Sequence, residues 1–223
     1  MLDACESIKE NNIVTCSFVT CLTMASRSFQ YFLVSFLVVL VLSAKPGLGT
    51  TVRKVTRCTE REKQALLHFK HGLVDDHCLL SSWGDEQDKR DCCRWRGVHC
   101  SKRSSHVVKL HLPAPPTEFD GVYQSLRGQI SPSLLELEHL THLDLSFNDF
   151  EGIPMPPLLA SLTKMQHLNL SHANFTGSLP SQLGNLSNLL SLDLSLNDDL
   201  HSGNLECLSH LSSLRLLDLS MLV

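Results

Sequence analysis

The pentapeptides HLDLS (142–146), HLNLS (167–171), SLDLS (191–195) and LLDLS (216–220) repeat one pattern along this chain of 223 residues. Their first leucines, Leu143, Leu168, Leu192 and Leu217, are separated by 25, 24 and 25 residues. A fixed period of this length is typical of proteins whose repeats stack into a solenoid. VVKLHLP at 107–113 is an imperfect earlier unit, so we expect about four to five repeats over residues 107–223.

The paired leucines of each unit predict a short strand. Because side chains alternate between the two faces of a strand, both leucines of a Leu-x-Leu segment point to the same side. No single repeat can bury its leucines alone, so stacked repeats share one continuous core and a parallel sheet on the inner curve. Asn148 and Asn197 follow two of these strands, where a buried amide can bond to loop backbone. Ala173 takes this place in the repeat between them, which predicts a weaker turn.

Residues 50–106 precede the repeats and predict a helical cap. Thr59, followed three residues later by Glu62, forms the pattern of a capping box at the start of a helix. Gly72 is the expected end of that helix. Along this segment, apolar residues recur at helical spacing on one face, with charged residues elsewhere. These apolar residues are Ala65, Leu66, Phe69 and Leu73.

Nine cysteines are many for a reduced cytosolic protein of this size and indicate an oxidising compartment. Adjacent Cys92 and Cys93 cannot easily bond to each other, so each needs a partner elsewhere. We favour Cys58–Cys92 together with Cys93–Cys100. The alternative is a zinc site from Cys92, Cys93, His99 and Cys100, although this spacing matches none of the usual tetrahedral patterns. We expect Cys78 and Cys207 to be small buried apolar side chains.

The first 49 residues are expected to lie outside the fold. Residues 24–49 have the order of a secretory signal peptide, with Arg27, an apolar run of eleven residues from Phe32 to Leu42, and Lys45-Pro46-Gly47 as a breaker. An uncleaved signal anchor is the alternative. Residues 1–23 are interpreted as a non-structural extension ahead of a natural start at Met24.

Several motifs carry a family resemblance over nearly all of the chain from residue 58 onward. NFTGSLPSQLGNLSNLLSLDLS (174–195) resembles the plant-specific leucine-rich repeat, with Gly152 and Gly177 on the template glycine and Pro180 on the template proline. WRGVHC (95–100) is similar to the N-terminal cap of the same family. FEGIPMP and ECLSHLSSLRLLDLS resemble the opening repeats of plant receptor-like proteins of the ethylene-inducing-xylanase-receptor type. The chain thus looks like an N-terminal fragment of such a protein.

The resemblance implies an α/β solenoid, a leucine-rich-repeat horseshoe segment with a helical, disulfide-stapled N-terminal cap. It implies a non-catalytic extracellular recognition module in plant defence or signalling, which binds a protein or peptide ligand, including ligands of microbial origin. A co-receptor kinase is the implied partner of the full-length parent, which would be a type I cell-membrane protein with its span beyond this chain. The alternatives are a secreted inhibitor of a microbial cell-wall-degrading enzyme, similar to polygalacturonase inhibitors, and an inactive truncated product.

Composition and motifs exclude other classes of function. The net charge of −4 gives no general affinity for nucleic acid. The sequence contains no hydrolase, metalloprotease, phosphate-loop or dinucleotide motif, so we expect neither catalysis nor a cofactor.

Polar positions flanking the Leu-x-Leu segments are the candidate ligand contacts. They are His142, Asp144, Phe147, His167, Asn169, His172 and Asp193. Neighbouring strands lie about 4.8 Å apart, so His142 should adjoin His167, and Asp144, Asn169 and Asp193 should form a row. A polar solvated face is the preferred interpretation; a pH-sensitive patch and a two-histidine metal site are the alternatives.

Three Asn-x-Ser/Thr sequons predict N-glycosylation in a secreted chain. They begin at Asn169, Asn174 and Asn185. A glycan at Asn169 would stand on the inner face and obstruct binding there, whereas Asn174 and Asn185 are expected on turns and the outer side.

Overall fold

The computed structural model describes residues 58–115, 123–201 and 205–222. The signal peptide and the extension expected over residues 1–49 lie outside these residues. Within the described part of the chain, no helix is both long enough and apolar enough to cross a membrane.

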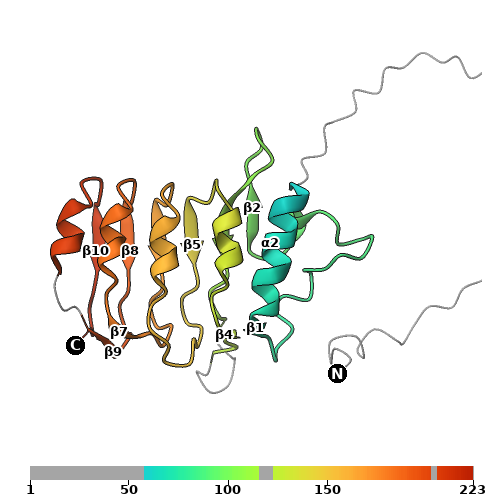
Figure 1. The fold of residues 1–223 in the computed structure, drawn as a ribbon. Coiled ribbons are helices and arrows are strands. Elements are labelled where there is room, and N and C mark those ends of the chain that lie inside the picture. The colour runs from blue at the N-terminus through green and yellow to red at the C-terminus, as the bar shows by residue number, and fades with distance from the viewer. Residues whose placement is uncertain (1–57, 116–122, 202–204, 223) are drawn as a thin grey trace, which may run out of the picture. The chain divides into compact units, whose positions relative to one another are not determined.

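A six-stranded sheet runs through the repeats in the order β10-β8-β6-β5-β3-β2 (Figure 1). Neighbouring strands from β3 to β10 are parallel, as the repeats predict, whereas β2 pairs with β3 in the antiparallel direction. The strands are β2 (Val98–Cys100), β3 (Val107–His111), β5 (His142–Asp144), β6 (His167–Asn169), β8 (Ser191–Asp193) and β10 (Leu216–Asp218).

Short 3₁₀ helices lie on the other side of the core from the sheet. They are stacked in a row that α2 (Glu60–His71) begins (Figure 1). They are η2 (Pro132–Glu136), η3 (Pro157–Ser161), η4 (Ser181–Asn185) and η5 (Leu205–His210). A further 3₁₀ turn, η1 (Cys92–Arg94), lies in the cap. Two small ladders complete the described strands: β1 (Leu73–Val74) with β4 (Arg127–Gly128), and β7 (Thr176–Ser178) with β9 (Asp199–His201).

The core consists of the leucines that the pattern selects. Leu143, Leu168 and Leu192 are each 2% exposed or less. The second leucines of the same segments, and those of the preceding turns, are also buried. In β10, by contrast, Leu217 at the equivalent position is 47% exposed, and Leu216, which pairs with Ser191 at an outward position, is 66% exposed. The alternation of a strand therefore accounts for one continuous apolar layer beneath the sheet.

Buried asparagines hold the loops that follow the strands. The Nδ2 of Asn148 donates to the carbonyls of Leu112 and Leu145, and its Oδ1 accepts the N–H of Leu126 at 2.8 Å. Where Ala173 replaces the asparagine, the N–H of Phe150 donates to the backbone carbonyl of Ala173 at 3.0 Å. The backbone thus satisfies this donor, and a weaker turn at Ala173 stays a prediction.

Helix α2 has the ends that the sequence predicts. Both hydrogen bonds of the capping box between Thr59 and Glu62 are present, and the N–H of Gly72 closes the last turn. Lys63 is also buried at 5% exposure, which the apolar pattern did not predict. Its Nζ lies 2.6 Å from Asp85 and 3.0 Å from Glu60, so two carboxylates compensate the charge.

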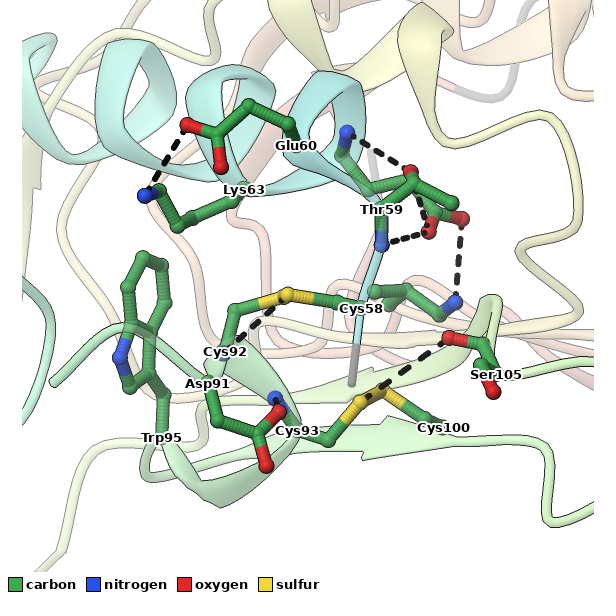
Figure 2. Close-up of a disulfide and its surroundings, with 12 residues drawn as sticks. Cys58, Thr59, Glu60, Lys63, Asp91, Cys92, Cys93, Trp95, Cys100 and Ser105 are labelled. Atoms are coloured by element: carbon green, nitrogen blue, oxygen red, sulfur yellow. Dashed lines mark hydrogen bonds and ion pairs between the residues drawn. A yellow bond between two sulfur atoms is a disulfide. The ribbon is translucent and has the colours of Figure 1, made fainter. Parts of the chain in front are cut away.

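Two disulfides with both cysteines among the described residues join the cap (Figure 2). They link Cys58 to Cys92 and Cys93 to Cys100, the pairing favoured from the sequence. The alternative zinc site from Cys92, Cys93, His99 and Cys100 is wrong, because each of its three sulfur atoms is used in a disulfide bond. The expectation of a buried apolar side chain at Cys78 is also wrong: Cys78 is disulfide-bonded and half-buried, in a turn with φ 55°. Cys207 is buried, as expected.

Gly97 allows the cap to join the sheet. It adopts φ +75°, and a Cβ placed on it would lie 2.4 Å from the carbonyl oxygen of His111. The N–H of His111 donates to the carbonyl of Gly97 at 2.8 Å. Only a residue without a side chain permits this approach of β2 to β3.

Candidate functional site

The sheet face, the solvent side of the six-stranded sheet, collects the predicted contact residues in register. His142 pairs with His167, and Asp144 pairs with Asn169. Asn169 in turn pairs with Asp193. The leucine between the two outward positions of each strand is buried, so each strand presents one residue on either side of it. The two predicted rows are therefore present.

The histidine pair is partly withdrawn from solvent. The rings of His142 and His167 stack with their centroids 4.3 Å apart, and the Nδ1 of His142 lies 2.8 Å from the Oγ1 of Thr141. Burial lowers the pKa of His142, and the nearby His167 and Lys109 lower it further. Each of these effects disfavours the protonated form. His142 is consequently neutral where an isolated imidazole would begin to charge.

Side-chain hydrogen bonds fix the orientation of the second row. The Oδ1 of Asp144 accepts the N–H and the hydroxyl of Ser146, and the Oδ1 of Asp193 accepts the same pair from Ser195. Asn169 repeats this arrangement with Ser171. One oxygen of each residue is thus used locally, and the rest of the head group can face a ligand. The Oδ2 of Asp144 lies 3.0 Å from the Nδ1 of His111.

An apolar rim borders the sheet face just after the strands; it comprises Tyr123, Phe147, His172 and Leu196. Tyr123 and Phe147 stack at 4.6 Å, and Phe147 and His172 stack at 5.2 Å. Phe147, His172 and Leu196 have φ values of 59°, 50° and 57°. This left-handed conformation costs a residue with a Cβ about 1–2 kcal/mol. The turns hold these side chains at the rim at that cost, and Leu196 is 43% exposed.

Two hollows lie on the sheet face. One, of about 290 Å³, lies over β3, β5, β6 and β8 and includes His142, Asp144, His167, Asn169 and Asp193 in its lining. The other, of about 580 Å³, lies where the cap meets the repeats and brings Phe147 together with Tyr123, Arg96 and His111. Of the seven predicted contacts, His172 and Phe147 thus lie at the rim and the other five share the smaller hollow.

The sequence interpretation missed the contribution of the cap and of the first strand. Lys109 and His111 occupy the positions in β3 that His142 and Asp144 occupy in β5. His99 of β2 pairs with Lys109. Aligning VVKLHLP with the later repeats would have found Lys109 and His111. No repeat pattern marks His99, because β2 belongs to the cap.

The sequons differ in their surroundings. Asn169 lies on the sheet face in β6, as expected, with its Oδ1 bound to Ser171. Asn174 is exposed on a turn, where its Nδ2 donates to the Oδ1 of Asp149 at 2.6 Å. Asn185 is exposed at the end of η4 on the helical side. Glycosylation at these residues stays a prediction.

Comparison with known proteins supports the fold and the family. Residues 59–101 match the Leucine rich repeat N-terminal domain. Receptor-like protein EIX1 of Solanum lycopersicum is 45% identical over 185 residues, which are 81% of this chain and 18% of the relative. The chain therefore spans about a fifth of the length of this relative.

Solved plant ectodomains have the same architecture. A chain of the BIR3–SERK2 complex of Arabidopsis thaliana superposes with a TM-score of 0.62 at 30% identity, covering 71% of this chain and 80% of the other. The GASSHO1/SCHENGEN3 ectodomain of the same plant, solved with CASPARIAN STRIP INTEGRITY FACTOR 2, gives a TM-score of 0.58 at 31% identity, covering 71% and 18%. By its disulfide-bonded cap, its repeats and these similarities, the chain belongs to the leucine-rich-repeat receptor-like proteins of plants.

Proposed function

We propose that this chain is a non-catalytic recognition module that binds a protein or peptide ligand on its sheet face, as part of a plant receptor-like protein in defence or signalling. The observation that carries the proposal is the sheet face itself. Side chains of different chemistry stand there in register on a rigid layer of buried leucines. A surface fixed in this way loses little conformational entropy when a ligand binds.

Two further observations support the proposal. The apolar rim keeps Phe147 and Leu196 at the border of the face in a conformation that disfavours residues with side chains, and such strain concentrates at functional sites. Related ectodomains bind polypeptides: GASSHO1/SCHENGEN3 was solved with CASPARIAN STRIP INTEGRITY FACTOR 2, and BIR3 with SERK2. A co-receptor kinase is accordingly the second partner that we propose for the longer parent.

The location that we propose is the extracellular side of the cell membrane, with anchoring supplied by the longer parent. The disulfides Cys58–Cys92 and Cys93–Cys100 support passage through the secretory pathway, because such bonds form and persist in oxidising compartments.

Photo-crosslinking tests the proposed face. Phe147 is replaced by a benzophenone analogue of phenylalanine in the secreted chain, which is then exposed to plant extracellular fluid with and without microbial culture filtrate. The matched control carries the same group at Leu135, which is 36% exposed on η2, on the helical side. We expect discrete polypeptide adducts from position 147 and none of them from position 135. Equal adducts from both positions, or none from either, would refute the proposal.

A further inference from the structure

A row of four basic side chains crosses the sheet face from the cap into the repeats. His99 on β2 pairs with Lys109 on β3, Lys109 pairs with His142 on β5, and His142 pairs with His167 on β6. These four residues form the cationic stripe. Neighbouring strands lie about 4.8 Å apart, so the stripe is about 14 Å long over its three intervals. It ends at Ser191 on β8.

The positive charge of the stripe, which comes from Lys109 and from its histidines once they take up protons, is largely uncompensated by the surroundings. Arg96 and His111 add to it in the hollow at the cap. Two carboxylates, Asp144 and Asp193, line the smaller hollow beside it. Asp144 is partly engaged, since its Oδ1 accepts from Ser146, and its Oδ2 lies 3.0 Å from the Nδ1 of His111 without a hydrogen bond between them. Asp193 is on β8, one strand beyond the stripe. A basic track therefore stands on a chain whose net charge is −4.

We propose that the cationic stripe binds an acidic segment of a polypeptide ligand and that this binding takes up protons, so that it tightens as the pH falls. The proposal rests on the proposed function, since it assigns a ligand chemistry to the same sheet face. The ligand carries Asp or Glu carboxylates along one edge, and these pair with the imidazolium and ammonium groups of the stripe.

The protonation of the stripe supports this coupling. The pKa of His99 is lowered by burial and by the positive charges of Lys109 and His111. The pKa of His142 is lowered by burial and by His167 and Lys109. Imidazoles held neutral in this way bind a proton when an opposite charge arrives, because a nearby carboxylate favours the charged form. Each unit by which a docked carboxylate raises such a pKa is worth a factor of ten in affinity at low pH.

The apolar rim favours a polypeptide over an acidic polysaccharide. Side chains of an extended peptide point alternately to opposite sides. A segment lying along the solenoid axis can therefore direct carboxylates toward the stripe and apolar side chains toward Phe147, His172 and Leu196. At about 3.3 Å per residue, four residues cover the stripe. A uronic acid polymer has carboxylates but no apolar side chains to meet the rim.

Fluorescence anisotropy with a labelled hexaglutamate peptide tests the proposal on the secreted chain, with hexaglutamine as the neutral probe. We expect hexaglutamate to bind at least about tenfold more tightly at pH ~5.5 than at pH ~7.5, and hexaglutamine to show no such change. His142→Gln with His167→Gln should reduce the pH effect to about twofold. Lys109→Gln should weaken binding at both pH values and leave a pH effect in place, because it removes one positive side chain while the histidines remain.

The matched control removes two exposed histidines elsewhere, by His68→Gln on α2 and His201→Gln on β9, and should bind as the native chain does. The proposal is overturned by pH-independent binding, by equal loss in this control, or by an oligogalacturonate that binds where hexaglutamate does not. Circular dichroism identifies any variant that fails to fold. In that case the proposal is tested by the proton uptake of the native chain on binding, which calorimetry in two buffers measures. If hexaglutamate does not bind while position 147 still gives crosslinked adducts, the proposed recognition function stands and the proposed ligand chemistry is wrong.

Discussion

Substitution of Asn197 by Ala removes the side-chain hydrogen bonds that join two successive repeats. Asn197 is 1% exposed. Its Nδ2 donates to the carbonyls of Leu194 at 2.7 Å and Leu170 at 2.9 Å, and its Oδ1 accepts the N–H groups of Phe175 at 3.0 Å and Ala173 at 3.2 Å. The variant leaves both N–H groups inside the protein without their acceptor.

The expected loss of stability follows from these two donors. A buried donor deprived of its partner costs about 1–3 kcal/mol. Water entering the space left by the amide recovers part of this cost, so we expect Asn197→Ala to lower the free energy of unfolding by about 2–4 kcal/mol. A domain has a total of only about 5–15 kcal/mol, so this loss is a large fraction of its stability.

Urea unfolding followed by far-ultraviolet circular dichroism measures the change, and hydrogen exchange at Ala173 and Phe175 locates it. Tryptophan fluorescence is unsuitable, because Trp83 and Trp95 both report on the cap. Asn188→Ala is the matched control, since Asn188 is exposed and its Nδ2 makes one bond, to the carbonyl of Thr163. Equal destabilisation by both variants, with unchanged exchange at the two amides, would refute the reasoning.

Three further variants test the cap and the sheet face. Cys93→Ser with Cys100→Ser should cost about 2 kcal/mol in urea unfolding and release the β2 amides to hydrogen exchange; an unchanged exchange pattern would contradict the role of this disulfide. Gly97→Ala should lower the melting temperature by several degrees, because φ +75° and a contact at 2.4 Å both oppose a Cβ; native stability in this variant would show that β2 can move. His142 has a pKa lowered from 6.5, so the unfolded chain takes up its proton first, and stability present above about pH 6.5 is lost as the pH falls. His142→Asn should therefore lose less melting temperature between pH ~7 and ~5 than the native chain, and an equal loss would count against the assignment.

The repeat pattern was sufficient to predict the parallel sheet and its core because both follow from a local rule. Leucines at alternate positions share a face, and a period of 24–25 residues returns each strand to the same place in the next repeat. The register of His142 with His167, and of Asp144 with Asn169, follows from that rule without further information.

Features that depend on non-repeating contacts could not be predicted in this way. Strand β2 has three residues, and its pairing with β3 depends on Gly97 and on the Cys93–Cys100 disulfide. The burial of Lys63 depends on Asp85, 22 residues away in the cap. The positive φ values of Phe147 and Leu196 are conformations that neither residue type favours, so the residue types gave no signal for them.

The cap of this chain is part of the proposed recognition surface as well as a lid on the core. His99 extends the basic row of the repeats by one strand, and Arg96 lines the adjoining hollow. Both residues lie between Cys93 and Cys100, within the loop that this disulfide closes, so the same covalent constraint that holds the cap on the first repeat also positions these basic side chains. Although β2 runs antiparallel to β3, His99 pairs directly with Lys109 and therefore lies on the same face of the sheet. Changes at Arg96 and His99 can therefore alter ligand preference without disturbing the leucine core, whereas Trp95, Gly97 and Val98 of the same segment are fixed by burial or by backbone geometry.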